Sequence, residues 1–148
     1  MNKISFNLEN KNIVITGGNG FLGNQITNTL LYEKANVYII DINIPKKKKS
    51  AKYFKSDITN EKHLKEILKF FKLKKIKIDV LINNAAIDYP PLKSKKNNFK
   101  LEAFSNKLWD KDISVSLKGS YLCTKVFGSY MSKFKKGSII NVSSDLGI

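Results

Sequence analysis

A glycine-rich turn near the start of the chain has the residue types and spacing for binding phosphate. Residues 16–23 read Thr-Gly-Gly-Asn-Gly-Phe-Leu-Gly, which fits the G-x-G-x-x-G spacing through Gly18, Gly20 and Gly23. Without side chains, the backbone can turn tightly and approach a pyrophosphate, and a following helix offers free N–H groups and a partial positive charge. Gly23 would let that helix pack closely on the preceding strand. The alternative is a flexible turn with a tight helix start.

An acidic residue ends the next apolar run, where a ribose-binding carboxylate is expected. Asp41 closes the sequence Val-Tyr-Ile-Ile-Asp. A carboxylate there can accept hydrogen bonds from both hydroxyls of an adenosine ribose, and it repels a 2′-phosphate. The residue type therefore favours NAD over NADP, although the nearby lysine loop 46–49 could soften the preference. The alternative is that Asp41 only caps the end of its strand.

Short apolar runs alternate with amphipathic stretches, and these elements must position the turn and the acid. The predicted strands are residues 12–16, 36–40, 52–55, 79–82 and 138–142, and the predicted helices are residues 21–31, 61–73 and 109–134. Alternation of this kind indicates βαβ units with right-handed crossovers. The sequence therefore predicts an α/β fold, a Rossmann-like doubly wound parallel sheet of about five strands in the order 3-2-1-4-5. Residues 88–100 are polar and contain proline, which predicts a loop.

Four motifs together resemble the short-chain dehydrogenase/reductase family, and they cover nearly the whole chain in the family's order. After the glycine turn come Asp57-Ile58, the turn Asn-Asn-Ala-Ala at residues 83–86, and Gly-Ser-Ile-Ile-Asn-Val-Ser-Ser-Asp-Leu-Gly at residues 137–147. The resemblance implies hydride transfer between the nicotinamide of NAD(P) and an alcohol or carbonyl substrate. The stretches 83–94 and 108–128 further resemble a bacterial subgroup associated with surface-polysaccharide or flagellin-glycan synthesis, which implies a sugar substrate.

The resemblance also implies a role for individual residues. The serine that orients the substrate carbonyl corresponds to Ser144, whose alternative role is a loop-start hydroxyl. Ser116 stands where the family has an asparagine that supports a proton relay, and its shorter side chain puts that relay in doubt. The implied cofactor contacts are Gly17, Gly18, Asn19, Gly20, Phe21, Leu22, Gly23, Asp41, Asp57, Ile58, Asn83, Ala85 and Ala86.

The family's general acid/base is a tyrosine whose pKa is lowered by a lysine in a Tyr-x-x-x-Lys pair, because phenol is a poor acid/base at neutral pH. By resemblance that pair should lie beyond Ser144, where few residues remain. We therefore expect residues 1–148 to be one cofactor-binding domain, truncated before the tyrosine helix and catalytically silent alone. Tyr121 and Lys125 fit the spacing but precede the serine in mid-helix. They are interpreted as a core or interface aromatic and a solvated lysine.

The composition favours some partners and excludes others. A formal net charge of +15 would suit nucleic acid or a membrane surface. However, every basic residue is lysine, whereas a dedicated nucleic-acid binder would use the planar fork of arginine. The lysine excess accompanies many Asn and Ile residues and indicates a compositional bias over the surface. We predict a small-molecule substrate and no nucleic-acid or membrane partner.

Cysteine usage and hydropathy indicate a reducing compartment. Cys123 is the only cysteine, so no disulfide framework or metal site is predicted, and its apolar neighbours predict a small core residue. No apolar segment is long enough for a leader or a membrane span. We expect a cytoplasmic protein that forms a homo-oligomer in its full-length form. The alternative to an enzyme is a dinucleotide-binding module without catalysis.

Overall fold

The computed structural model of the chain describes residues 7–87 and 105–143, which fold around a parallel β-sheet. Five strands hydrogen-bond in the order β3-β2-β1-β4-β5, and each adjacent pair is parallel. The strands are β1 (Asn12–Thr16), β2 (Asn36–Asp41), β3 (Lys52–Lys55), β4 (Val80–Asn83) and β5 (Ser138–Asn141). The predicted fold class and strand order are confirmed.

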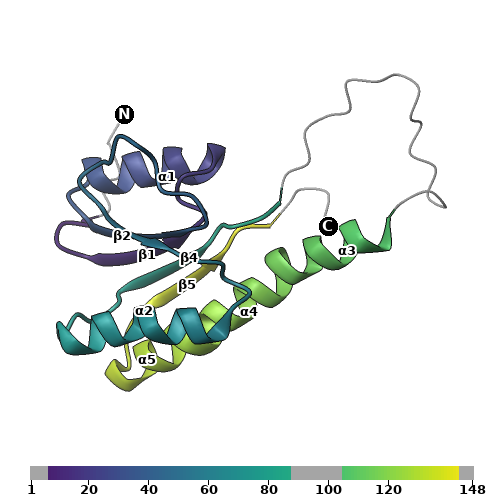
Figure 1. Ribbon diagram of the computed structural model, residues 1–148. Helices are drawn as coiled ribbons and strands as arrows, with labels where there is room; N and C mark the ends of the chain where they lie inside the picture. The colour runs from purple at the N-terminus through teal and green to yellow at the C-terminus, as the bar shows by residue number, and fades with distance from the viewer. Residues whose placement is uncertain (1–6, 88–104, 144–148) are drawn as a thin grey trace.

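Helices cover both faces of the sheet (Figure 1). Helix α1 (Phe21–Tyr32) lies on one face, and α2 (Glu61–Leu73) lies on the other beside a helical stretch at residues 106–134. We call this stretch the long helix. Its segments are α3 (Asn106–Ile113), η2 (Ser114–Gly119), α4 (Ser120–Cys123), η3 (Thr124–Gly128), α5 (Ser129–Met131) and η4 (Ser132–Phe134). The predicted loop at residues 88–100 lies outside the described residues.

Apolar periodicity and capping explain why α2 forms where the sequence predicted it. Its buried side chains recur at helical spacing and are Leu64, Ile67, Leu68 and Phe71. The side chain of Asn60 caps the helix by accepting hydrogen bonds from the backbone N–H groups of Lys62 and His63, at 3.1 and 3.3 Å. Helix α1 differs, because Gly20 precedes it and provides no side-chain cap.

Each face of the sheet has its own hydrophobic core. On the α1 face, Ile13 and Ile15 of β1 pack with Leu30 and Ile39. On the opposite face, Val14 of β1 packs with residues of α2 and the long helix. Side chains alternate between the two faces along a strand, so the apolar run of β1 supplies both cores.

The edge strand β5 and the outer flank of the long helix expose apolar side chains. All four residues of β5 are exposed, including Ile139 and Ile140. On the long helix the exposed large side chains include Trp109, Leu117 and Tyr121. The edge of the sheet and the flank of the long helix are therefore partly apolar surfaces of the described chain. We expect the isolated chain to be prone to aggregation, since open strand edges and large apolar patches promote association.

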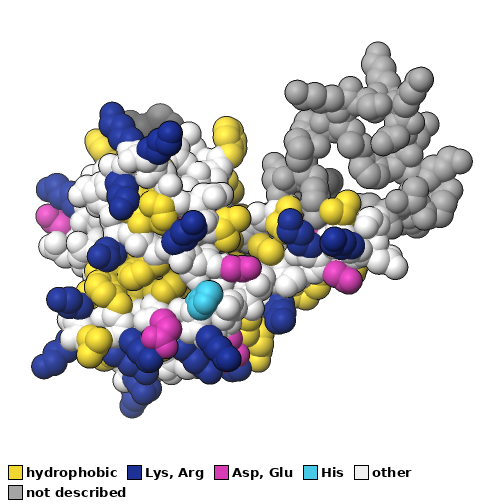
Figure 2. Space-filling view, viewed as in Figure 1, with side chains coloured by type: hydrophobic (Ala, Val, Ile, Leu, Met, Phe, Trp, Pro, Cys, Tyr) yellow, Lys and Arg dark blue, Asp and Glu magenta, His cyan; other side chains and the backbone are white. Residues whose placement is uncertain are grey.

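Lysine side chains are spread over the face seen in Figure 2, with acidic and hydrophobic side chains between them. This distribution fits a compositional bias better than one continuous basic surface. Within the described parts of the chain, none of the helices has the length and apolar character needed to cross a bilayer.

The thiol of Cys123 should be protected in the folded chain. Cys123 is fully buried on the long helix, and burial raises the pKa of its thiol to about 12. Because only the thiolate reacts, we expect alkylation at pH 8 to be at least about a hundredfold slower in the native chain than in urea. Timed labelling with iodoacetamide, followed by mass spectrometry, measures both rates. Equal rates would contradict the buried position of this residue.

Candidate functional site

The glycine turn lies between β1 and α1, at the point where the order of strands reverses. β1 pairs with β2 on one side and with β4 on the other, so the turn faces the carboxyl ends of all three strands. Gly17 has a φ of +64°, a conformation that favours glycine, and its N–H donates to the Ile40 carbonyl at 2.9 Å. In doubly wound sheets this crevice is where ligands bind.

Close backbone packing explains the spacing of the glycines. A Cβ atom at Gly23 would lie 2.1 Å from the Gly17 carbonyl oxygen, and one at Gly18 would lie 2.9 Å from a methyl group of Ile39. A Cβ at Gly17 would lie 2.8 Å from the Cα of Ala85. Helix α1 therefore starts directly against the turn, and the close contact predicted between Gly23 and the strand is instead a contact with the Gly17 carbonyl just beyond β1.

The start of α1 presents the other residues of the turn to solvent. Gly20 is exposed, and Phe21 and Leu22 have relative exposures of 94 % and 50 %. In the first turn of an α-helix the backbone N–H groups have no acceptor within the helix, and here no side chain caps them. The arrangement can therefore donate hydrogen bonds to an anion at this end of the sheet.

Asp41 is buried at the end of β2 and fastens the glycine turn. Its carboxylate accepts hydrogen bonds from the backbone N–H groups of Asn19, at 3.0 Å, and Asn43, at 2.9 Å. The side chain of Asn19 also donates to the carbonyl of Asn43. Asp41 thus does cap its strand, the alternative that the sequence left open, and it also faces the turn. A carboxylate has further acceptor sites, so these two bonds do not use its full capacity to accept hydrogen bonds.

Asn84 ties the end of β4 to the glycine turn, and the sequence prediction did not include it among the site residues. Its side-chain amide donates to the carbonyls of Thr16 and Gly17, at 3.0 and 3.1 Å. The backbone N–H groups of Asn84 and Ala85 both donate to the Thr16 hydroxyl at 3.0 Å. Its place inside the Asn-Asn-Ala-Ala turn was the available signal. Ala86 follows as an exposed residue.

The hydrogen-bond partners of the neighbouring Asn83 lie on the long helix and on β5, away from the glycine turn. Its side-chain amide donates to the Thr124 hydroxyl at 3.1 Å and to the Asn141 side chain at 2.8 Å, so it joins β4 to β5 and the long helix. The Asn83 side chain is buried, and its Oδ1 has no partner among the described residues. Its side chain therefore acts as a structural tie, and a cofactor contact through it stays a prediction.

Asp57 and Ile58 follow β3 at the same edge of the sheet as Asp41. The N–H of Ser56 donates to the Asp41 carbonyl at 2.9 Å, which places this segment beside the end of β2. Asp57 is exposed and accepts from the N–H of Thr59 at 2.8 Å. The side chain of Ile58 is 5 % exposed and belongs to the core beneath the long helix. Of this pair, Asp57 faces the surface, whereas Ile58 is buried.

The serine positions are only partly described. Ser116 is exposed on the π-helical segment η2, and its carbonyl accepts a hydrogen bond from the Ser120 hydroxyl at 2.7 Å. Ser144 lies outside the described residues, beyond β5. Short π-helical segments are often found at functional sites. The structure therefore describes Ser116 and the strand before Ser144, and the position of Ser144 relative to Ser116 stays a prediction.

The Tyr-x-x-x-Lys sequence within the long helix agrees only in part with the expected core or interface aromatic and solvated lysine, since both side chains are exposed. Tyr121 is 61 % exposed, so it is not a core residue. Lys125 forms an ion pair with Glu61 of α2 at 3.2 Å, so it is not simply solvated. The helix turns Tyr121 outward and Lys125 towards α2, which sequence spacing alone could not distinguish. A role for Tyr121 at an interface stays a prediction.

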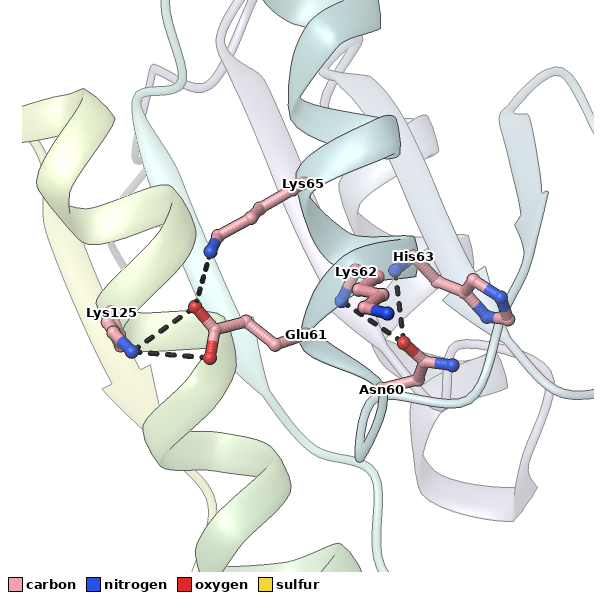
Figure 3. A network of polar contacts seen from close by, with 6 residues as sticks. All are labelled: Asn60, Glu61, Lys62, His63, Lys65 and Lys125. Carbon is pink, nitrogen blue, oxygen red and sulfur yellow. Dashed lines mark hydrogen bonds and ion pairs between the residues drawn. The ribbon is translucent and has the colours of Figure 1, made fainter.

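Glu61 joins α2 to the long helix through the contacts in Figure 3. Its carboxylate lies 2.8 Å from the ammonium group of Lys65 and 3.2 Å from that of Lys125. Hydrogen bonds from Lys65 and then from Lys125 lower the pKa of Glu61 below its ordinary value. The side chains remain partly exposed, so solvent screens this interaction.

We expect Glu61→Gln to remove an acid-sensitive contribution to stability. A folded-state pKa below the unfolded value stabilises the chain above the unfolded pKa, and this contribution is lost as pH falls through the folded pKa. The variant should therefore unfold at lower urea concentration at pH 7, and the difference should shrink in acid. Glu66→Gln, at an exposed residue paired within α2 to Lys69, is the control and should show a smaller difference. A difference that grows towards low pH would contradict this account.

Comparison with known protein families agrees with this geometry. A sequence model of the family described as short chain dehydrogenase matches residues 11–148. A 3-oxoacyl-[acyl-carrier-protein] reductase of Thermotoga maritima is 33 % identical over 95 % of this chain and 58 % of its own length. A sorbitol-6-phosphate 2-dehydrogenase of Klebsiella pneumoniae is 26 % identical over 96 % of this chain and 55 % of its own length. The chain thus spans about half the length of the curated relatives it matches.

Solved structures show the same relationship. A ligand-free aldohexose dehydrogenase of Thermoplasma acidophilum has a TM-score of 0.79 at 28 % identity, over 93 % of this chain and 50 % of its own. A short chain dehydrogenase of Leptospira borgpetersenii with bound NAD+ has a TM-score of 0.75 at 27 % identity, over 90 % of this chain and 51 % of its own. The protein ElxO with bound NADP has a TM-score of 0.81 at 28 % identity, over 93 % and 57 %. With the glycine turn, the parallel sheet and the matched residues in agreement, the chain belongs to the short-chain dehydrogenase family.

Proposed function

We propose that this chain is the cofactor-binding part of an NAD-dependent oxidoreductase that acts on an alcohol or carbonyl substrate. The observation that carries the proposal is that the glycine turn packs directly against the start of α1, where no side chain caps the first backbone N–H groups. Asp41 accepts a hydrogen bond from the backbone N–H of Asn19 in the same turn. A bound nicotinamide would supply the hydride acceptor or donor. The residues present fit the dinucleotide, because the pyrophosphate needs a backbone surface without side chains and with free N–H groups.

Individual residues have distinct tasks in this proposal. The N–H groups of Phe21 and Leu22 in the first turn of α1 would bind the pyrophosphate, and Gly18 and Gly23 keep that surface open. Asn84 holds the turn in place from β4. Asp57 and the backbone of Ile58 would line the adenine side, next to Asp41.

The preference for NAD over NADP rests on Asp41. A 2′-phosphate on the adenosine ribose would lie beside a carboxylate and be repelled. Lys46, Lys47 and Lys48 are exposed on the loop that follows, while the ammonium group of Lys49 is occupied by the side chain of Asn24. Similar structures hold NAD in one case and NADP in another, so the family alone does not decide the preference.

Further parts of the proposal come from the family. Ser144 would orient the substrate carbonyl, with Ser116 at the relay position. Small polyols or sugars are the substrate class that we favour, since the similar proteins include an aldohexose dehydrogenase and a sorbitol-6-phosphate 2-dehydrogenase. A cytoplasmic homo-oligomer is the expected form of a full-length protein.

Fluorescence titration of the chain with NADH and NADPH tests the proposal. We expect saturable binding of NADH with a Kd at least about tenfold lower than that of NADPH, which corresponds to about 1.4 kcal/mol. Tight binding of neither nucleotide would contradict a dinucleotide site at the glycine turn. Equal affinities would contradict the assignment of the preference to Asp41.

A dinucleotide-binding module without catalysis is the second candidate, because the glycine turn and its hydrogen bond to Asp41 could hold a nucleotide without any catalytic residue. Both candidates predict NADH binding without turnover of alcohols by this chain alone, and measurable turnover would contradict both. Sequencing the gene beyond the codon for Ile148 separates them. A continuing frame with a Tyr-x-x-x-Lys helix identifies the oxidoreductase, whereas its absence identifies the module.

A further inference from the structure

The segment before α2 packs closely against the long helix at Gly119, where the absence of a side chain leaves space for Ile58. Gly119 is buried on the long helix, and a Cβ atom added there would lie 2.5 Å from Cδ1 and 2.7 Å from Cγ1 of Ile58. The Ile58 side chain thus occupies the space that any other residue at position 119 would need. Because Ile58 is only 5 % exposed, its place is set by this contact and the core around it.

An ion pair joins the long helix to the first residue of α2, three residues after Ile58. Glu61 at the start of α2 pairs with Lys125 of the long helix at 3.2 Å, and also with Lys65 of its own helix at 2.8 Å (Figure 3). Only the pair with Lys125 connects different elements. Lys65 therefore provides a matched comparison, because it has the same partner and charge but does not link α2 to the long helix.

The segment 56–60 contains Ile58 and directly precedes Glu61, and it borders the proposed adenine side of the site. Its first residue is joined to the end of β2 by the Ser56 N–H bond to the Asp41 carbonyl. Its later residues form a turn, in which the N–H of Asn60 donates to the Asp57 carbonyl at 3.2 Å. The long helix that holds this segment also carries Ser116, close before Gly119. One helix therefore contacts the adenine-side segment and carries the proposed relay position.

We propose that Gly119 and Lys125 are positioning residues that lock the segment 56–60 to the long helix. Through them, the adenine-side wall and the helix of Ser116 keep a fixed relative position. This inference rests on the proposed function in one respect, namely that the nucleotide lies along Asp57. The contacts themselves do not depend on that proposal, so they can be tested without a nucleotide.

Gly119→Ala is the first test, with Gly128→Ala as the matched control on the same helix. Alanine favours a helix more than glycine does by about 1 kcal/mol, so helix propensity alone predicts that both variants gain stability. A Cβ at Gly128 has nearest neighbours at 3.1 and 3.8 Å, which is milder than the contact at Gly119. We expect Gly119→Ala to speed amide hydrogen exchange in residues 56–60 by about tenfold, while Gly128→Ala changes it by less than about twofold.

Two further variants, Ile58→Val and Lys125→Met, distinguish a local loss of positioning from a general loss of folding. Ile58→Val removes the Cδ1 methyl nearest to the added Cβ, so we expect it to recover about half of the exchange protection lost in Gly119→Ala. Lys125→Met should also speed exchange in residues 56–60, whereas Lys65→Met should not. Both lysines are more than 45 % exposed, so neither substitution opens the core.

The Kd for NADH tests whether this positioning affects nucleotide binding. We expect the Kd for NADH to rise about tenfold in Gly119→Ala and to return towards the original value with Ile58→Val. If the unsubstituted chain does not bind NADH, the proposed function fails, yet hydrogen exchange still decides the positioning role. If Gly119→Ala and Lys125→Met leave exchange in residues 56–60 as slow as their controls do, the inference is overturned.

Discussion

Gly23→Ala is expected to abolish measurable NADH binding and to lower the stability of the chain. The added Cβ would lie 2.1 Å from the carbonyl oxygen of Gly17 and 2.8 Å from the side-chain nitrogen of Asn84. The first of these atoms belongs to the backbone of the glycine turn and cannot move aside as the end of a flexible side chain can. Helix α1 must therefore shift from the turn, which removes the surface for the pyrophosphate. Overpacking of this kind costs about 1–3 kcal/mol.

The control for this substitution is Gly20→Ala. Gly20 has an extended conformation with a φ of −69°, and its added Cβ would have one close neighbour, the Gly17 carbonyl oxygen at 3.3 Å. We expect a smaller loss, less than about tenfold in the Kd for NADH, against at least about a hundredfold for Gly23→Ala. Titration and urea unfolding measure the two effects separately. Equal affinities for the two variants would show that the packing of α1 on the turn does not shape the site.

Asp41→Asn is expected to remove the preference for NADH over NADPH and to weaken NADH binding about tenfold. The carboxamide has the shape of the carboxylate, but it lacks the charge that repels a 2′-phosphate. Its amide group would also meet one of the two backbone N–H groups that now donate to Asp41, those of Asn19 and Asn43. A lost hydrogen bond to a charged group costs about 1.5–3 kcal/mol. The substitution therefore loosens the turn as well as changing the charge.

Asp79→Asn is the control that separates the lost hydrogen bond from the changed charge at the ribose position. The Asp79 carboxylate accepts a hydrogen bond from the backbone N–H of Asn12 at 2.9 Å, next to the start of β1 and away from the strand ends that face the site. We expect this variant to lose stability without changing the ratio of the two cofactor affinities. Titrations with NADH and NADPH and urea unfolding of both variants provide the comparison. The role of Asp41 would be contradicted if its substitution left the affinity ratio unchanged.

The sequence predicted the sheet and the turn because local patterns determine them. Apolar runs of strand length, amphipathic helices between them, and glycines at a strand end specify a doubly wound sheet with little dependence on distant contacts. The predicted boundaries of the long helix were less accurate. It starts at Asn106, before the predicted residue 109, in a polar stretch where apolar periodicity gives no signal.

The direction of side chains around the site could not be predicted in the same way. Asn83 and Asn84 are adjacent and identical, yet Asn84 donates to the glycine turn and Asn83 to the long helix and β5. Asn83 is the last residue of β4 and Asn84 the first beyond it, so the packing at the strand end decides which amide reaches the turn. The same limit applies to Lys125, whose partner Glu61 is distant in sequence. The family motif identifies the Asn-Asn-Ala-Ala turn as part of the site, but tertiary packing determines which of its side chains contacts the glycine turn.

The central claim is that the turn at residues 17–23 binds a dinucleotide through its backbone N–H groups. Amide NMR of the isotope-labelled chain during titration with NAD+ tests it most directly. We expect the largest shift changes at Asn19, Phe21 and Leu22, with smaller changes near Asp57, and almost none at the opposite ends of the strands. Shift changes confined to the lysine loop 46–49, or spread evenly over exposed lysines, would show charge-driven contact with phosphate and would contradict the claim.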